Sequence, residues 1–356
     1  MQPEIVTAGA APCRADSIAP AYQAAARVVA SVYREHRIIL GLVAGYIAIG
    51  GLALTAFGRP WPIKPTNVVF AVIWTAASAL WLCWQYLRSP RHLRRALAAS
   101  RVLGALLVAL LVVPLQITFQ SLKQSIGPVI GFTADPFLHR LDVLLHGKTA
   151  WLWLEPILAT PWLVRALDML YMAWFFGLFV FVLWASWTRH RAVRQRALIA
   201  FLLIWIGAGT VVAGSLPSAG PCYYSHVVAG ASPYEGLIGR LDSIGLEHGE
   251  LRARFNERWL WENARSGGWR HFAGIAAMPS LHVAASVLFA LVAWSRSRLL
   301  GGLLTLYAAA IQVGSVVLAW HYAVDGYLGA ILAFTAWTLA GFLSRADQRG
   351  ELRMAA

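Results

Sequence analysis

Charged residues are scarce in this chain. They make up 13% of its 356 residues, whereas hydrophobic residues make up 59%. A soluble domain usually has about 25% charged residues, so the shortage argues against a soluble protein, although the length would accommodate two or three such domains. Several apolar runs instead reach about 18 to 22 residues, which is enough to cross a hydrocarbon layer about 30 Å thick. The sequence therefore predicts a polytopic membrane protein.

Cysteine is also rare, with only Cys13, Cys83 and Cys222 in the chain. Three scattered cysteines give neither a disulfide framework nor the ligand spacing of a metal site. No metal and no other cofactor is therefore expected. The first 37 residues contain no apolar segment of the kind that a cleavable signal peptide requires. We therefore expect the first span to act as an uncleaved anchor.

Acidic residues are outnumbered by basic ones, and the formal net charge is +14. A basic chain can bind nucleic acid, but here Lys and Arg occur in short clusters between apolar runs rather than along one face. Such clusters orient membrane proteins and contact anionic lipid headgroups. We therefore expect a membrane as partner and no nucleic acid. The sequence does not indicate an oligomeric state.

The apolar runs predict an all-α membrane bundle of about eight transmembrane helices, because a spanning segment must satisfy its own backbone hydrogen bonds. The predicted spans are 38–57, 67–87, 102–121, 162–187, 197–215, 277–294, 299–319 and 321–343. With this count, 18 of the 30 Lys and Arg residues fall on the side that holds both termini. The positive-inside rule places that side in the cytoplasm, and the membrane is the cell inner membrane if the source is bacterial.

Two longer connections fall on the opposite, extracytoplasmic side, at 122–161 and 216–276. In the first, the stretch 135–142 is followed by Trp151 and Trp153. This pattern predicts an amphipathic helix that lies in the membrane interface. The second connection is richer in Gly, Pro and charge, and we expect it to cap the external surface.

Two histidines lie at predicted span ends on this same side. His282 begins the sixth span and His321 begins the eighth, 39 residues later, which is about the length of two crossings and a turn. Asp325 follows His321 by four residues, so on a helix both side chains share a face. The carboxylate can then orient the imidazole and stabilise its charged form. The alternative is a helix-end His–Asp pair that serves packing or interface anchoring.

The residues before His282 predict an anion site. Pro279 suits the first turn of a helix, because its missing N–H is not needed there. The exposed N–H groups of that turn and the Ser280 hydroxyl can bind a phosphate. The alternative for a Pro-Ser dipeptide is an ordinary helix cap.

These motifs carry a family resemblance. Pro279–His282 and His321–Asp325 resemble the second and third signature motifs of the type 2 phosphatidic acid phosphatase superfamily. Leu281 and the His-Tyr-x-x-Asp form more closely resemble the branch that contains inositol phosphorylceramide synthases. The stretches 119–123, 141–142, 146–147 and 216–221 also resemble that branch. The resemblance covers residues 115–343.

The resemblance implies a mechanism. His321 would attack phosphorus and form a phosphohistidine, with Asp325 orienting and charging it. His282 would protonate the departing alkoxide and then activate the second nucleophile. Lys123 and Ser280 would neutralise the non-bridging oxygens of the transition state.

The chain departs from the common phosphatase pattern at two places. The Ser-Arg pair of the third motif is replaced by Gly314 and Ser315, and no Arg-Pro pair follows Lys123. A phosphate-neutralising arginine must then come from elsewhere, and Arg270 is the candidate, or a hydroxyl does part of the work. For Lys123 itself the alternative is an interface-anchoring lysine.

Together these observations predict an enzyme that cleaves a lipid phosphoester at the extracytoplasmic face, with a phospholipid or polyprenyl phosphate as substrate. A lipid acceptor would make it an inositolphosphotransferase-like enzyme. Water as acceptor would make it a lipid phosphate or prenyl diphosphate phosphatase. A rival prediction is a proton-coupled transporter whose His–Asp pair relays protons, although the spans show no chain of acids across the bilayer.

The expected organisation follows from these assignments. Residues 1–37 form a cytoplasmic arm, 38–100 an accessory transmembrane hairpin, 101–343 the catalytic membrane domain and 344–356 a cytoplasmic tail.

Overall fold

The computed structural model describes residues 15–61, 65–88, 98–267 and 273–355, and it contains helices but no strand in these ranges. The helices are α1 (Ala15–Ala56), α2 (Pro65–Arg88), α4 (Ala99–Ile130), α5 (Asp135–His146), η1 (Ala150–Trp153), α6 (Glu155–Leu158), α7 (Pro161–Trp187), α8 (Arg191–Leu203), η2 (Ile204–Val212), α9 (Ala213–Ser215), η3 (Pro221–Tyr223), α10 (Tyr224–Val227), α11 (Glu235–His248), α12 (Arg252–Arg265), α13 (Leu281–Trp294), α14 (Arg298–Val317) and α15 (Ala323–Ala355). The fold is the predicted all-α membrane bundle. The chain is therefore an integral, multi-pass membrane protein.

A helix is present at each of the eight predicted spans, but only six helices of the described residues are long and apolar enough to cross a membrane. The other two apolar helices are shorter in the described residues, at Val72–Trp84 within α2 and at Leu281–Trp294, which is α13. The sixth span was predicted to begin at residue 277, whereas α13 begins four residues later, after a non-helical segment that ends in Pro279 and Ser280. Its 14 residues are only about 21 Å long.

Two helices extend well beyond their predicted spans. Helix α1 begins at Ala15, inside the predicted N-terminal arm. Helix α4 continues to Ile130, nine residues past the predicted end of its span. Lys123 therefore lies on a helix and not in a connection between helices. The 32 residues of α4 span about 48 Å, so its last turns reach beyond a hydrocarbon layer.

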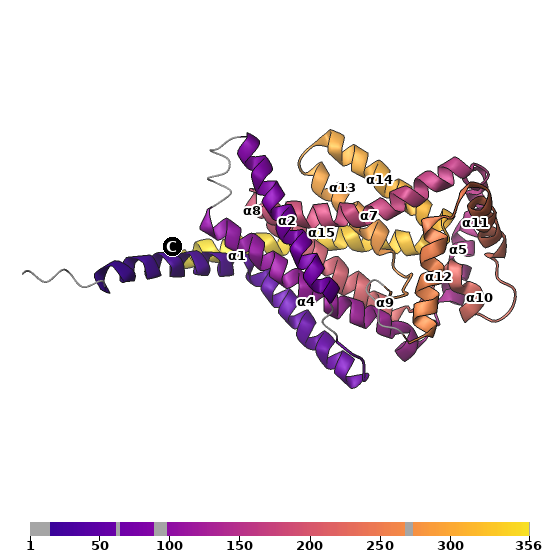
Figure 1. Ribbon diagram of the computed structural model, residues 1–356, viewed down its shortest axis with the longest axis horizontal. Coiled ribbons are helices and arrows are strands. Elements are labelled where there is room, and N and C mark those ends of the chain that lie inside the picture. Colours follow the sequence, from indigo (N-terminus) through magenta and orange to yellow (C-terminus); the bar gives the residue numbers. More distant parts are fainter. Residues whose placement is uncertain (1–14, 62–64, 89–97, 268–272, 356) are drawn as a thin grey trace, which may run out of the picture.

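The N-terminal part of α1 and the C-terminal part of α15 lie side by side at one end of the bundle (Figure 1). Arg37 of α1 pairs with Asp347 of α15. Arg194, at the start of α8, pairs with Glu35 of α1. The N-terminal arm, the basic 188–196 connection and the C-terminal segment therefore meet at the same end, as the predicted eight-span topology requires.

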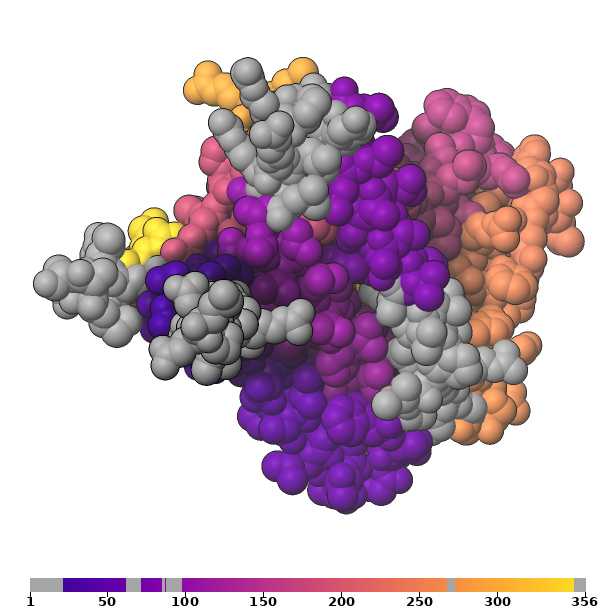
Figure 2. Space-filling model, turned by 60° about the vertical axis from the view of Figure 1, so that its left-hand side comes forward, coloured from indigo at the N-terminus to yellow at the C-terminus, as the bar shows by residue number. Residues whose placement is uncertain are grey.

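At the opposite end, α5, α10, α11 and α12 form a cap over the bundle (Figure 1). The cap is fastened to α7 by two side chains. Asp168 accepts hydrogen bonds from the main-chain N–H groups of Arg252 and Ala253, at 2.7 and 2.8 Å, and Arg165 donates to the Gly249 carbonyl at 2.8 Å. Figure 2 shows α1, α2 and α4, in indigo to purple, on the face beside the orange α12.

Helix α5 confirms the helix predicted over 135–142, but it is more than a surface element of the interface. Asp135 and Asp142, seven residues apart on α5, are both buried. An ionisable side chain is seldom fully buried unless hydrogen bonds hold it. The partners of both carboxylates lie around the two histidines.

Candidate active site

His321 lies in the turn between α14 and α15, and its imidazole is held by Asp325 in the first turn of α15. The Nδ1 atom of His321 is 3.2 Å from Oδ2 of Asp325, and the same oxygen accepts a hydrogen bond from the Tyr322 N–H at 3.1 Å. Asp325 is fully buried and His321 is 7% exposed. Because Nδ1 is engaged, Nε2 is the ring nitrogen that remains for chemistry.

His282 lies in the first turn of α13, and its ring centroid is 6.3 Å from that of His321. The predicted hairpin therefore does return the two histidines to one place. The His282 ring stacks on Tyr171 at 4.2 Å and lies 4.1 Å from the Trp174 ring. Its Nε2 atom is buried without a hydrogen-bond partner. Aromatic rings therefore hold the His282 imidazole in place beside His321.

The beginnings of α13 and α15 are joined directly. The Ser280 N–H donates to the Asp325 carbonyl at 3.0 Å. A Cβ atom at Gly329 would lie 2.6 Å from the Ser280 carbonyl oxygen, so the close approach of the two helices requires glycine there. The Ser280 hydroxyl accepts from the Val283 N–H at 3.4 Å. It thus caps α13, and Ser280 is not among the described residues that line the cavity below.

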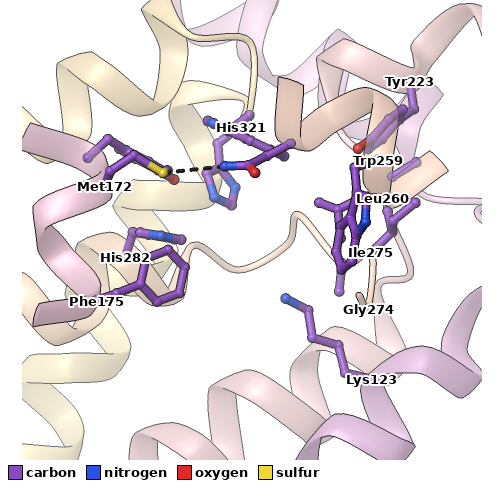
Figure 3. A pocket seen from close by; sticks show the side chains of 15 residues that line it. Lys123, Met172, Phe175, Tyr223, Trp259, Leu260, Gly274, Ile275, His282 and His321 are labelled. Carbon is purple, nitrogen blue, oxygen red and sulfur yellow. Dashed lines mark hydrogen bonds between the residues drawn. The ribbon is translucent and has the colours of Figure 1, made fainter. Parts of the chain in front are cut away.

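A cavity of about 430 Å³ opens beside the two histidines. Figure 3 shows the histidines on one side, Trp259 and Ile275 on the other, and the Lys123 ammonium directed into the space between them. Gly274 makes room for this lysine, because a Cβ atom there would lie 2.8 Å from Lys123 Cγ. The structure therefore brings Lys123, predicted from resemblance alone, to the same cavity as the histidines.

Several buried donors of the cavity lining have no partner. The Tyr171 hydroxyl and Trp320 Nε1 join His282 Nε2 in this group. Buried polar groups without a hydrogen-bond partner are rare in folded proteins. Together with the lysine, they would suit the oxygens of an anion. Among the described residues, no three His, Cys, Asp or Glu side chains are placed to hold a metal ion.

No arginine is among the described residues that line the cavity, and Arg270, the predicted phosphate ligand, lies outside the described residues. The sequence predicted a hydroxyl as the alternative phosphate ligand without identifying which one. The Tyr171 hydroxyl and Trp320 Nε1 line the cavity, and neither residue was predicted from the sequence. The only sequence signal for either residue was that Trp320 directly precedes His321.

Asp135 explains how the 216–221 stretch is held beside the site, to which only a resemblance had linked it. Its carboxylate accepts four hydrogen bonds, from Ser218 Oγ at 2.8 Å and from the Ala219 N–H, the Gly220 N–H and the Tyr322 hydroxyl at 2.9 Å each. One buried carboxylate therefore ties the 216–221 stretch to the residue that follows His321.

The 216–221 stretch and Cys222 directly after it also contact the segments that precede the two histidines. The Ser218 carbonyl accepts from the Ala277 N–H at 2.9 Å, and the Cys222 N–H donates to the Ala319 carbonyl at 2.9 Å. Gly220 has a φ of 97°, and a Cβ atom there would lie 2.7 Å from the Trp320 carbonyl oxygen. Glycine is therefore needed both for the backbone conformation and for the close approach.

Asp142, the second buried carboxylate of α5, supports the start of α15. It accepts hydrogen bonds from the Val324 N–H at 3.2 Å and the Ala150 N–H at 3.4 Å. Burial raises the pKa of Asp142, and His146 and these N–H groups partly offset that effect. A carboxylate at a helix N-terminus stabilises the helix start, here the turn that carries His321 and Asp325.

Comparison with known proteins agrees with this geometry. A family model described as the PAP2 superfamily matches residues 136–339, which is more than half of the chain and includes both histidines and Asp325. A search of curated proteins and a search of solved structures found no match. The chain therefore belongs to the PAP2 superfamily, and this membership together with its membrane-spanning helices supports a membrane lipid phosphatase or phosphotransferase.

Proposed function

We propose that the protein cleaves a lipid phosphoester through a phosphohistidine on His321 and transfers the phosphoryl-bearing group to an acceptor, most like an inositolphosphotransferase. The observation that carries the proposal is the arrangement of His321, His282 and Lys123 around one cavity. A nucleophile held by a carboxylate, a second imidazole and a cation are the parts that phosphoryl transfer needs.

In the first step, the Nε2 lone pair of His321 attacks phosphorus and forms a P–N bond. The P–O bond to the leaving group breaks, and the leaving oxygen takes a proton from the His282 imidazolium. Asp325 balances the positive charge that develops on the His321 ring through its contact with Nδ1. Lys123, with the Tyr171 hydroxyl and Trp320 Nε1, would neutralise the non-bridging oxygens.

In the second step, the now neutral His282 takes the proton of the acceptor hydroxyl, whose oxygen attacks phosphorus. The P–N bond breaks and its electron pair returns to His321, so both histidines regain their starting states. An apolar lining that includes Met172, Phe175 and Leu260 favours a lipid hydroxyl over water as the acceptor. With water as the acceptor, the same steps would release the phosphorylated headgroup or phosphate.

The site is proposed to face the extracytoplasmic side. It lies beneath the cap formed by α5 and α10–α12, at the opposite end from the Arg37–Asp347 and Arg194–Glu35 pairs. The basic residues near those pairs favour the cytoplasm. Under this orientation the substrate lipid enters from the outer leaflet.

The test is lipid mass spectrometry on the purified protein in mixed micelles that contain phosphatidylinositol, phosphatidic acid or prenyl diphosphate, with and without ceramide. A phosphorylated acceptor lipid that His321→Ala abolishes would identify a phosphotransferase, and a dephosphorylated lipid with free phosphate would identify a phosphatase. His248→Ala, an exposed position on α11, is the matched control and should retain activity. If no product depended on His321, the enzyme proposal would be wrong and a proton-coupled transporter would become the leading alternative.

A further inference from the structure

A second cavity lies directly beyond Lys123. Its volume is about 330 Å³, and its lining includes Arg59, Gln124 and Arg265. Lys123 and Ile275 line both this second chamber and the cavity of the histidines. A group bound at the lysine can therefore have one substituent beside His321 and another in the second chamber.

The second chamber is cationic. Two arginines and the shared lysine line it, and no Asp or Glu of the described residues does. Guanidinium groups bind phosphate and carboxylate oxygens with paired N–H donors. The lining thus differs from the largely apolar cavity of the histidines.

Six of the 13 described residues that line the second chamber lie outside the part of the chain that matches the superfamily. Arg59 lies just after α1, and Lys123 and Gln124 lie on α4, whereas the match covers 136–339. Arg265 ends α12 in the cap. The predicted accessory hairpin therefore contributes a charged residue to a cavity next to the candidate active site, which gives this hairpin a use beyond packing.

We infer that the second chamber binds a second anionic group of the substrate, so that the substrate carries two phosphate-type charges, one on the scissile phosphorus at His321 and one near Arg59 and Arg265. This inference rests on the proposed function. The shared chemistry has two sources, a lipid diphosphate and a phosphodiester lipid whose headgroup ends in a further phosphate. In both, Lys123 contacts the scissile phosphate between the two sites.

The test uses two matched pairs of lipids that differ only in the second phosphate. One pair is farnesyl phosphate and farnesyl diphosphate, and the other is phosphatidylglycerol and phosphatidylglycerol phosphate. The purified full-length protein in nanodiscs is assayed for kcat/KM on all four, as wild type, Arg59→Gln, Arg265→Gln, and His321→Ala. Arg258→Gln is the control, because Arg258 is an exposed arginine of the same helix α12 that pairs with Glu250.

The preference for the second phosphate is the ratio of kcat/KM for the lipid that carries it to kcat/KM for the lipid that lacks it. We expect this ratio to fall about tenfold or more within at least one pair in each arginine variant, because a hydrogen bond to a charged group contributes that much or more. Arg258→Gln should leave the preference unchanged. The pair that responds identifies the source of the second anion. If neither preference changes in the Arg59 and Arg265 variants, or if Arg258→Gln lowers it equally, the inference is overturned while His321-dependent cleavage still supports the proposed function. Absence of any His321-dependent product would instead overturn the proposed function, and the inference with it.

Discussion

The hydrogen bonds of Asp135 predict that its replacement by Asn destabilises the protein and slows turnover. Asp135 Oδ1 accepts from Ser218 Oγ, the Gly220 N–H and the Tyr322 hydroxyl, and Oδ2 accepts from the Ala219 N–H. An Asn side chain can place its carbonyl oxygen where Oδ1 accepts three hydrogen bonds. Its NH₂ group must then face the Ala219 N–H. One hydrogen bond to a charged acceptor is lost and two buried donors face each other, so we expect a loss of about 2–4 kcal/mol of unfolding free energy.

Tyr322→Phe is the informative partner of this substitution. It removes one of the four donors and leaves no orphaned donor behind, so it should cost only about 1–2 kcal/mol. Because Tyr322 adjoins His321, both variants should lower kcat more than they change KM. In the double variant the two losses should not add, because both remove hydrogen bonds from one carboxylate.

The measurements are SDS-induced unfolding in mixed micelles and turnover of the lipid substrate identified by mass spectrometry. Glu247→Gln, at an exposed side chain of α11, controls for the loss of a negative charge in the cap. An Asp135→Asn variant within about 0.5 kcal/mol of wild type, the range of ordinary surface substitutions, would refute the reasoning that this carboxylate fastens the loops of the site.

Asp325→Asn should lower kcat about 10³- to 10⁴-fold with little change in KM, because an amide favours the wrong tautomer of His321; steady-state kinetics test this, and a fall below tenfold would contradict it. Gly329→Ala should cost about 1–3 kcal/mol of unfolding free energy through overpacking against α13. Gly302→Ala on α14, where a Cβ atom meets nothing within 4 Å, should be tolerated. Equal unfolding curves for the two variants would show that the close approach of α15 to α13 does not require glycine. Burial raises the pKa of Glu257 from its ordinary 4.5 to about 8. The contribution of this group to stability is therefore complete below pH 4.5 and is lost as the pH rises through 8. Glu257→Gln should flatten the dependence of unfolding free energy on pH, and an unchanged slope of unfolding free energy between pH 5 and 8.5 would contradict the pKa shift.

The sequence by itself determined the membrane bundle and the central pair of histidines. Hydropathy is a local property, so the runs of apolar residues located helices at all eight predicted spans. The positions of His282 and His321 followed from the length of a hairpin, because two crossings and a turn return the chain to the same depth. The four-residue spacing of His321 and Asp325 also predicted their contact, although His321 lies two residues before α15 and not on the helix.

Only the tertiary structure decided how these residues are supported and what surrounds them. Asp135 and Ser218 are 83 positions apart, and no periodicity relates them; they meet because the start of α5 packs against the 216–221 stretch. The same applies to Tyr171 on α7 and Trp320 beside His321, whose orphaned donors are visible only once the cavity has formed. The second chamber, between the end of α1, α4 and the end of α12, depends on the packing of segments distant in sequence, and packing between distant segments is what local patterns leave undetermined.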